Sequence, residues 1–127
     1  MSWFRRPKAA SPRLRLFRLN IHLRRGRNVE MPANLIGAYV PVFVAAPDHE
    51  SAARAAVANV TGRGFEFVDI ADRQIVELDP TKWDEFVRDA WPELVDHFPS
   101  QSEVLKGLQS EFLWTGPFAS YDTPTDA

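Results

Sequence analysis

The chain of 127 residues contains no cysteine. It therefore cannot form a disulfide, a thiolate metal site or a cysteine nucleophile, and this composition is typical of cytoplasmic proteins. No apolar run is long enough to span a bilayer, and basic residues interrupt the N-terminal segment where a secretory signal would need an apolar stretch. We therefore expect a cytoplasmic protein with no membrane partner, and the length predicts one domain.

Catalytic signatures are also scarce. The sequence has neither the Gly-x-Ser-x-Gly nor the Ser-x-x-Lys pattern of serine enzymes. The three histidines, His22, His49 and His97, stand at no chelating spacing, so we expect no metal and no cofactor. The glycine-rich segment 61–64 follows a predicted helix, which is the reverse of the order in phosphate-binding loops. A serine, a histidine and an acid brought together by the fold remain an alternative.

The charge is divided unevenly along the chain. Residues 1–27 carry nine of the 15 basic residues and none of the 17 acids, so residues 28–127 are strongly acidic. Residues 1–12 contain two prolines and show no hydrophobic period, which predicts a flexible basic arm. The arm and the positions just after it could contact the phosphates of a nucleic acid. Their basic residues are Arg5, Arg6, Lys8, Arg13 and Arg15.

A strand–helix–strand unit occupies residues 38–70. Its first nine residues are apolar on both faces, which predicts a strand covered on both sides. Within that strand Pro41 lacks an N–H and requires an interruption of the pairing on one side. Asp48 is the predicted N-cap of the helix, and Gly62 is predicted to take the left-handed conformation after its end. Met31 precedes the whole unit, so it is an alternative start of translation.

Alternating apolar residues predict strands on either side of this helix. Over residues 13–24 the alternation changes phase near Leu16 and Phe17, which predicts a β-bulge there. Residues 65–70 and 74–78 flank a polar break, and this pattern predicts the two strands of a hairpin.

The clearest amphipathic pattern lies over residues 81–98 and predicts a second helix, which Pro92 kinks or divides. A shorter helix is predicted over 101–110, and a polar tail over 122–127. Together the elements predict a single α+β domain over 13–121, with a mixed or antiparallel sheet of four or five strands and the two main helices on one face. The predicted order, β-β-α-β-β-α-α, is loosely ferredoxin-like in shape, without a motif that identifies a family.

Carboxylates gather on the predicted polar side of the second helix. We expect them to be solvated and to form, with two acids at the start of the first helix, a docking face for a basic protein. The leading hypothesis is therefore a non-catalytic protein-binding module, such as an inhibitor or immunity protein that neutralises a cationic toxin or nuclease. The residues of this predicted acidic face are Asp84, Glu85, Asp89, Glu93, Asp96, Asp48 and Glu50.

The aromatic side of the same helix leaves a second hypothesis open. Trp83, Phe86, Trp91 and Phe98 either form core, which a small domain needs, or line a ligand groove. With a groove, the chain would be a small enzyme or ligand-binding protein with a pocket between the second helix and the sheet. A third hypothesis is a nucleic-acid-associated protein that uses the basic arm, although the acidic body would repel a polyanion.

Overall fold

The computed structural model describes residues 13–122. The predicted arm, with Arg5, Arg6 and Lys8, and residues 123–127 of the predicted tail lie outside the described residues. The α+β class is confirmed: residues 13–122 form one small domain that combines a five-stranded antiparallel sheet with three α-helices. In chain order the elements are β1 (Arg15–Arg24), β2 (Gly37–Ala46), α2 (His49–Gly62), β3 (Glu66–Leu78), the 3-10 helix η2 (Pro80–Lys82), α3 (Trp83–Ala90), the 3-10 helix η3 (Val95–His97), α4 (Gln101–Gly107), β4 (Leu113–Thr115) and β5 (Ala119–Tyr121).

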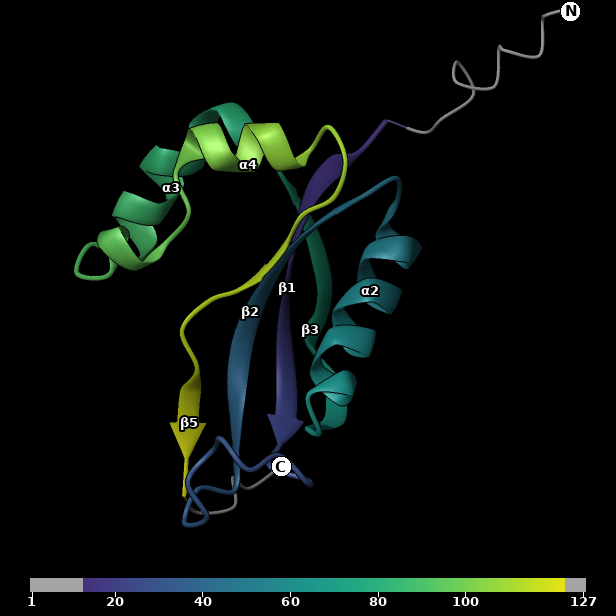
Figure 1. The fold of residues 1–127 in the computed structure, drawn as a ribbon, viewed down its shortest axis with the longest axis vertical. Helices are drawn as coiled ribbons and strands as arrows, with labels where there is room; N and C mark the ends of the chain where they lie inside the picture. Colours follow the sequence, from purple (N-terminus) through teal and green to yellow (C-terminus); the bar gives the residue numbers. More distant parts are fainter. Residues whose placement is uncertain (1–12, 123–127) are drawn as a thin grey trace, which may run out of the picture.

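The first strand, β1, lies in the middle of the sheet (Figure 1). The strand order is β3-β1-β2-β4, and β5 pairs with the other end of β2. Because β2 and β3 are both antiparallel to β1, they run parallel to each other, and α2 makes the connection between them. A chain that began at Met31 would lack β1 and would leave β2 and β3 without the strand that joins them.

The two faces of the sheet carry separate hydrophobic cores. Neighbouring strand residues point to opposite faces, so Phe17 faces α2 while Leu16 faces α3 and α4. The helices therefore cover opposite faces, not one face as predicted, because large apolar side chains stand on both. The predicted bulge at Leu16 and Phe17 is absent from the β1–β2 pairing, whose register runs unbroken along both strands.

The predicted hairpin is instead a single strand, β3, whose two halves both pair with β1. The register passes from Leu19–Ile75 to Ile21–Ile70, so residues 71–74 bulge out opposite one residue of β1. Within the bulge Asp72 and Arg73 have φ values of 58° and 53°. These left-handed angles also occur in tight hairpin turns, which is why the local sequence predicted a turn although the chain continues in the same direction.

Local signals in β2 and α2 are largely confirmed. Pairing on one side of β2 is interrupted at Pro41, as predicted, because β4 pairs with residues 42–44 and β5 with residues 37–39. Asp48 caps α2 by accepting a hydrogen bond from the Ser51 N–H at 2.8 Å. The glycine prediction is wrong by two residues: Gly62 stays in the helix, and Gly64 takes the positive φ of 90°.

The second helix is shorter than predicted. It ends at Ala90, since Pro92 cannot continue it, and the chain then forms a turn and η3. Asp79 caps η2 with hydrogen bonds from the Thr81 hydroxyl and N–H, which lower the pKa of its carboxyl. We call residues 80–107, which contain η2, α3, η3 and α4, the helical lobe.

Candidate docking surface and neighbouring pockets

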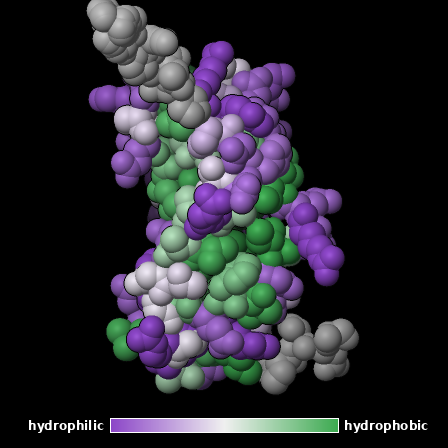
Figure 2. All heavy atoms as spheres, turned by 90° about the vertical axis from the view of Figure 1, so that its right-hand side faces the viewer, coloured by the Kyte–Doolittle hydropathy of each residue, from purple (hydrophilic) through white to green (hydrophobic). Residues whose placement is uncertain are grey.

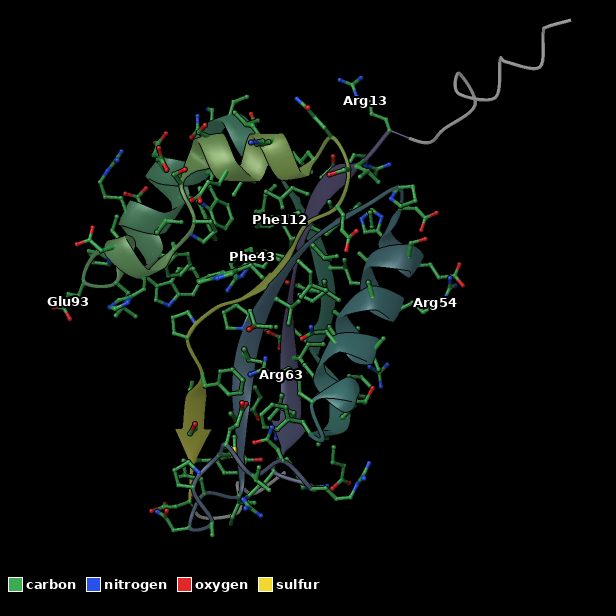
Figure 3. All side chains as sticks on the ribbon, in the orientation of Figure 1. Arg13, Phe43, Arg54, Arg63, Glu93 and Phe112 are labelled. Atoms are coloured by element: carbon green, nitrogen blue, oxygen red, sulfur yellow. The ribbon has the colours of Figure 1, made fainter. Side chains whose placement is uncertain are left out.

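The helical lobe is built around Phe43, which points from β2 into a cluster of aromatic rings (Figure 3). Phe43 and Trp83 are both almost completely buried, with ring centroids 5.0 Å apart. The Trp83 indole N–H donates to the Pro99 carbonyl at 2.8 Å. These rings fill the centre of the space between the second helix and the sheet, where the second hypothesis placed a pocket. The other rings within 6.4 Å of Phe43 belong to Phe86, Trp91, Phe98 and Trp114.

Five predicted acidic residues lie together on this lobe, and all are exposed. Asp84, Glu85 and Asp89 belong to α3, whereas Glu93 and Asp96 lie in the turn and the 3-10 helix beyond it. Glu93 marks the outer tip of the lobe in Figure 3. The shorter α3 thus spreads the five carboxylates over a longer surface than one continuous helix would.

Asp84 also joins two helices of the lobe. Its carboxylate accepts from the Gln101 N–H at 3.0 Å, and the Gln101 side-chain oxygen accepts from the Asp84 N–H at 3.1 Å. This reciprocal pair fixes the start of α4 against the start of α3, so the first carboxylate of the acidic surface is held by the fold.

The two remaining acids of the predicted face lie elsewhere. Asp48 and Glu50 stand at the start of α2, which covers the opposite face of the sheet. The Ser51 N–H that donates to Asp48 holds the pKa of that carboxyl below its usual value, and Glu50 pairs with Arg54 at 2.7 Å. Both acids are engaged in local structure of α2, so the seven predicted residues do not form one surface.

The acids of the lobe lack basic partners within residues 13–122. Every ion pair in that range uses a carboxylate outside the lobe. Between residues 80 and 98 the lobe has five acids but only two basic residues, Lys82 and Arg88. Two apolar side chains, Val95 and Leu105, are 39% and 37% exposed on the same lobe. The ion pairs are Arg15–Glu77, His22–Asp69, Arg24–Glu66, Arg54–Glu50 and Arg63–Glu30.

Of the predicted basic residues, Arg13 and Arg15 are described. Arg13 is exposed just before β1. Arg15 lies within β1, where its guanidinium donates to the Pro47 carbonyl at 3.2 Å and stands 3.3 Å from a Glu77 carboxylate oxygen. Arg15 therefore helps to hold the sheet and does not belong to a free basic arm.

Two of the three histidines, His22 and His49, pack against aromatic rings of the domain, and His97 is exposed. His22 stacks on Tyr39 with ring centroids 4.4 Å apart, and its Nε2 lies 2.6 Å from the Tyr121 hydroxyl, which ties β5 to β1. His49 packs its ring against Phe17. Residues 13–122 contain no group of three side chains that could hold a metal ion, and no helix there is long and apolar enough to cross a membrane.

Of the depressions outside the helical lobe, three concern the hypotheses made here. A shallow one on α2 is lined by Ala53, Val57 and Ala58, on the side where apolar residues run along the middle of the molecule in Figure 2. An open groove of about 240 Å³ lies beside Arg63, which Figure 3 shows near the end of α2. The third, of about 110 Å³, is a polar pocket beside Arg18.

Sequence reasoning did not find the pocket at Arg18. The available signal was an arginine in the middle of a well-alternating strand. Comparison of the chain with protein-family models, with characterised proteins and with solved structures finds no match.

Proposed function

We propose that the chain is a non-catalytic protein-binding module that docks a basic partner protein through the outer side of the helical lobe. One observation carries the proposal: five exposed carboxylates gather on this lobe and form no ion pair within residues 13–122, whereas all five ion pairs of that range use acids outside the lobe. In its sharpest form, the module is an inhibitor or immunity protein that covers the cationic active site of a toxin or nuclease.

Electrostatics supports this reading. Unpaired like charges on one surface attract a basic partner over several ångströms and raise the association rate. Because the carboxylates are exposed, they keep their hydration until the partner arrives, so folding does not carry the cost of burying them. The charges would therefore act mainly on encounter and orientation.

Apolar anchors and rigidity support it further. Interfaces draw most of their binding energy from a few apolar or aromatic side chains inside a polar rim. Val95 and Leu105 are exposed on the same lobe as the acids, and Trp91 is half-buried. The aromatic cluster beneath them fixes the surface before binding, which limits the entropy lost on association.

Association kinetics with a panel of basic nucleases and cationic toxins tests the proposal. We expect a saturable one-to-one complex with a panel member, whose association slows as salt rises. The triple variant Asp84→Asn, Glu85→Gln, Asp89→Asn should associate roughly tenfold more slowly at low salt, with little change in dissociation. Asparagine at the first position keeps the oxygen that accepts from Gln101, so the fold should survive.

A second triple variant provides the matched control: Asp72→Asn, Glu111→Gln, Asp122→Asn removes the same charge from exposed positions outside the lobe. It should associate at nearly the unmodified rate. Equal slowing by both variants would show that only net charge matters, and salt-independent association or the lack of any saturable complex would refute docking through the lobe.

A further inference from the structure

Arg18 stands in β1, in the middle of the sheet. It lies on the face of the helical lobe, and its guanidinium carbon stands 5.9 Å from the Phe86 ring centroid and 5.8 Å from that of Trp91. Within residues 13–122 its buried Nε has no hydrogen-bond partner, and no ion pair includes its side chain. A buried N–H group left without an acceptor is costly, and such groups commonly indicate an unseen ligand or water.

The Arg18 side chain lines the polar pocket of about 110 Å³, together with residues that have unused hydrogen-bonding groups. Asn20 lies two residues further along β1 and therefore on the same face. Gln74 approaches from β3. No side-chain hydrogen bond joins Asn20 or Gln74 to another residue in the described part of the chain. Three side chains with free N–H donors thus surround one small space.

The bulge in β3 creates this space. Asn20 has no register partner in β3, because residues 71–74 leave the ladder at that point. Asp72 and Arg73 hold left-handed angles that non-glycine residues rarely adopt. Such conformations persist where the surrounding structure enforces them, and they cluster at binding sites. Here they displace the strand and place Ala71, Asp72 and Gln74 around the opening.

We infer that this pocket binds a small monocarboxylate. A guanidinium matches the two oxygens of a carboxylate with parallel N–H groups, and cation–π contacts with the Phe86 and Trp91 rings restrict where this guanidinium can lie. Asn20 and Gln74 can donate to the same oxygens or bind a hydroxyl or keto group on the neighbouring carbon. Ala71 and Val76 offer apolar contact to the remaining carbon atoms.

Size and charge narrow the ligand class. The pocket holds the volume of about three or four water molecules, which fits acids of the size of acetate, pyruvate or lactate. The Asp72 carboxylate at the rim and the acidic helical lobe disfavour a dianion such as phosphate. The inference concerns a different surface from the proposed docking face, and either can fail without the other.

Titration of the full chain with sodium acetate, pyruvate and lactate at constant ionic strength tests the inference. Binding is followed by the NMR signals of the Trp91 indole and of the Asn20 and Gln74 side-chain amides. We expect saturation at millimolar concentrations with at least one of these acids, weaker binding of phosphate, and none of acetamide, which has the shape of acetate without its charge.

Arg18→Met should keep the packing against the rings and raise the dissociation constant at least tenfold. Arg63→Met is the matched control, because Arg63 also makes cation–π contacts with two rings, at 5.4 Å and 5.7 Å, but donates to Thr115 and lies near Glu30. It should bind the acid as the unmodified chain does. Equal weakening by both variants would overturn the inference.

If Arg18→Met fails to fold, Asn20→Ala and Gln74→Ala decide the question, since neither side chain forms a hydrogen bond within residues 13–122. Each should weaken binding about threefold or more. Unchanged binding in both, tighter binding of phosphate than of the acids, or equal binding of acetamide and acetate would overturn the assignment.

Discussion

Replacing Phe43 with alanine tests whether the two cores of the domain unfold as one unit. Phe43 is fully buried and has five aromatic rings around it. Truncating a buried phenylalanine costs about 3–5 kcal/mol, and edge-to-face contacts such as that with Trp83 place this site near the upper end. For a domain of this size, a loss of 4–5 kcal/mol lowers the thermal midpoint by roughly 15–20 °C.

Two probes follow the unfolding separately. Trp83, Trp91 and Trp114 all pack in the helical-lobe core, so tryptophan fluorescence reports that core once Trp3 is replaced by phenylalanine. Far-UV circular dichroism reports the helices and strands of the whole domain. Because β1 and β2 contribute residues to both cores, we expect both midpoints to fall together in urea and on heating.

A substitution on the opposite face is the control. Val42→Ala removes two buried carbon atoms from the α2 side of the same strand and should cost about 2 kcal/mol, again with coincident probes. A loss of less than about 1 kcal/mol in the free energy of unfolding of Phe43→Ala would contradict this expectation. So would a fluorescence midpoint of Phe43→Ala that falls while the circular dichroism midpoint stays at its original value, because the two cores would then unfold independently.

Three further predictions concern the backbone, the pH and the N-terminus. Gly64→Ala should destabilise the domain by about 1–2 kcal/mol or more in urea unfolding, because the φ of Gly64 is 90°. Gly62→Ala adds a methyl group that meets open space on a helix, and this variant should stabilise the domain by up to about 1 kcal/mol. The pKa values of Asp48 and Asp79 are lowered by hydrogen bonds from helix N-terminal residues. These two carboxylates therefore stabilise the fold above the ordinary pKa of 3.8, and that stabilisation is lost as the pH falls through the lowered values. With both residues changed to asparagine, which still caps a helix, the thermal midpoint should fall less steeply as the pH is lowered. Deleting residues 1–12 should shift the thermal midpoint by a few degrees at most, whereas a deletion that includes β1 should abolish cooperative unfolding.

The features that the sequence predicted correctly depend on neighbouring residues. The cap at Asp48 and the pairing gap at Pro41 follow from the chemistry of one side chain and its immediate context. The alternation along β1 likewise predicted a strand. The burial of both faces of β1 was not predicted. The change of phase at Leu16 and Phe17 is equally consistent with a bulge and with a strand that packs against a separate core on each face.

The features that were missed depend on pairing between distant residues. Asp72 and Arg73 have the same backbone angles in a hairpin turn and in a bulge, and only the partner strand distinguishes the two. In the sequence nothing distinguishes Arg18 from the other arginines of residues 13–27. Its cation–π partners, Phe86 and Trp91, lie far along the chain, so only the folded sheet brings the pocket together.

The bulge in β3 also affects whether copies of this chain can associate through the edges of their sheets. A long, flat outer strand offers unpaired N–H and C=O groups to which another chain can add, which is a common route to aggregation. In β3 the bulge divides thirteen residues into two short segments. At the other edge, β4 and β5 have three residues each and are separated opposite Pro41. Neither edge among residues 13–122 gives a long template for strand addition, so the protein should stay dispersed at concentrations where an unbroken edge would recruit other chains.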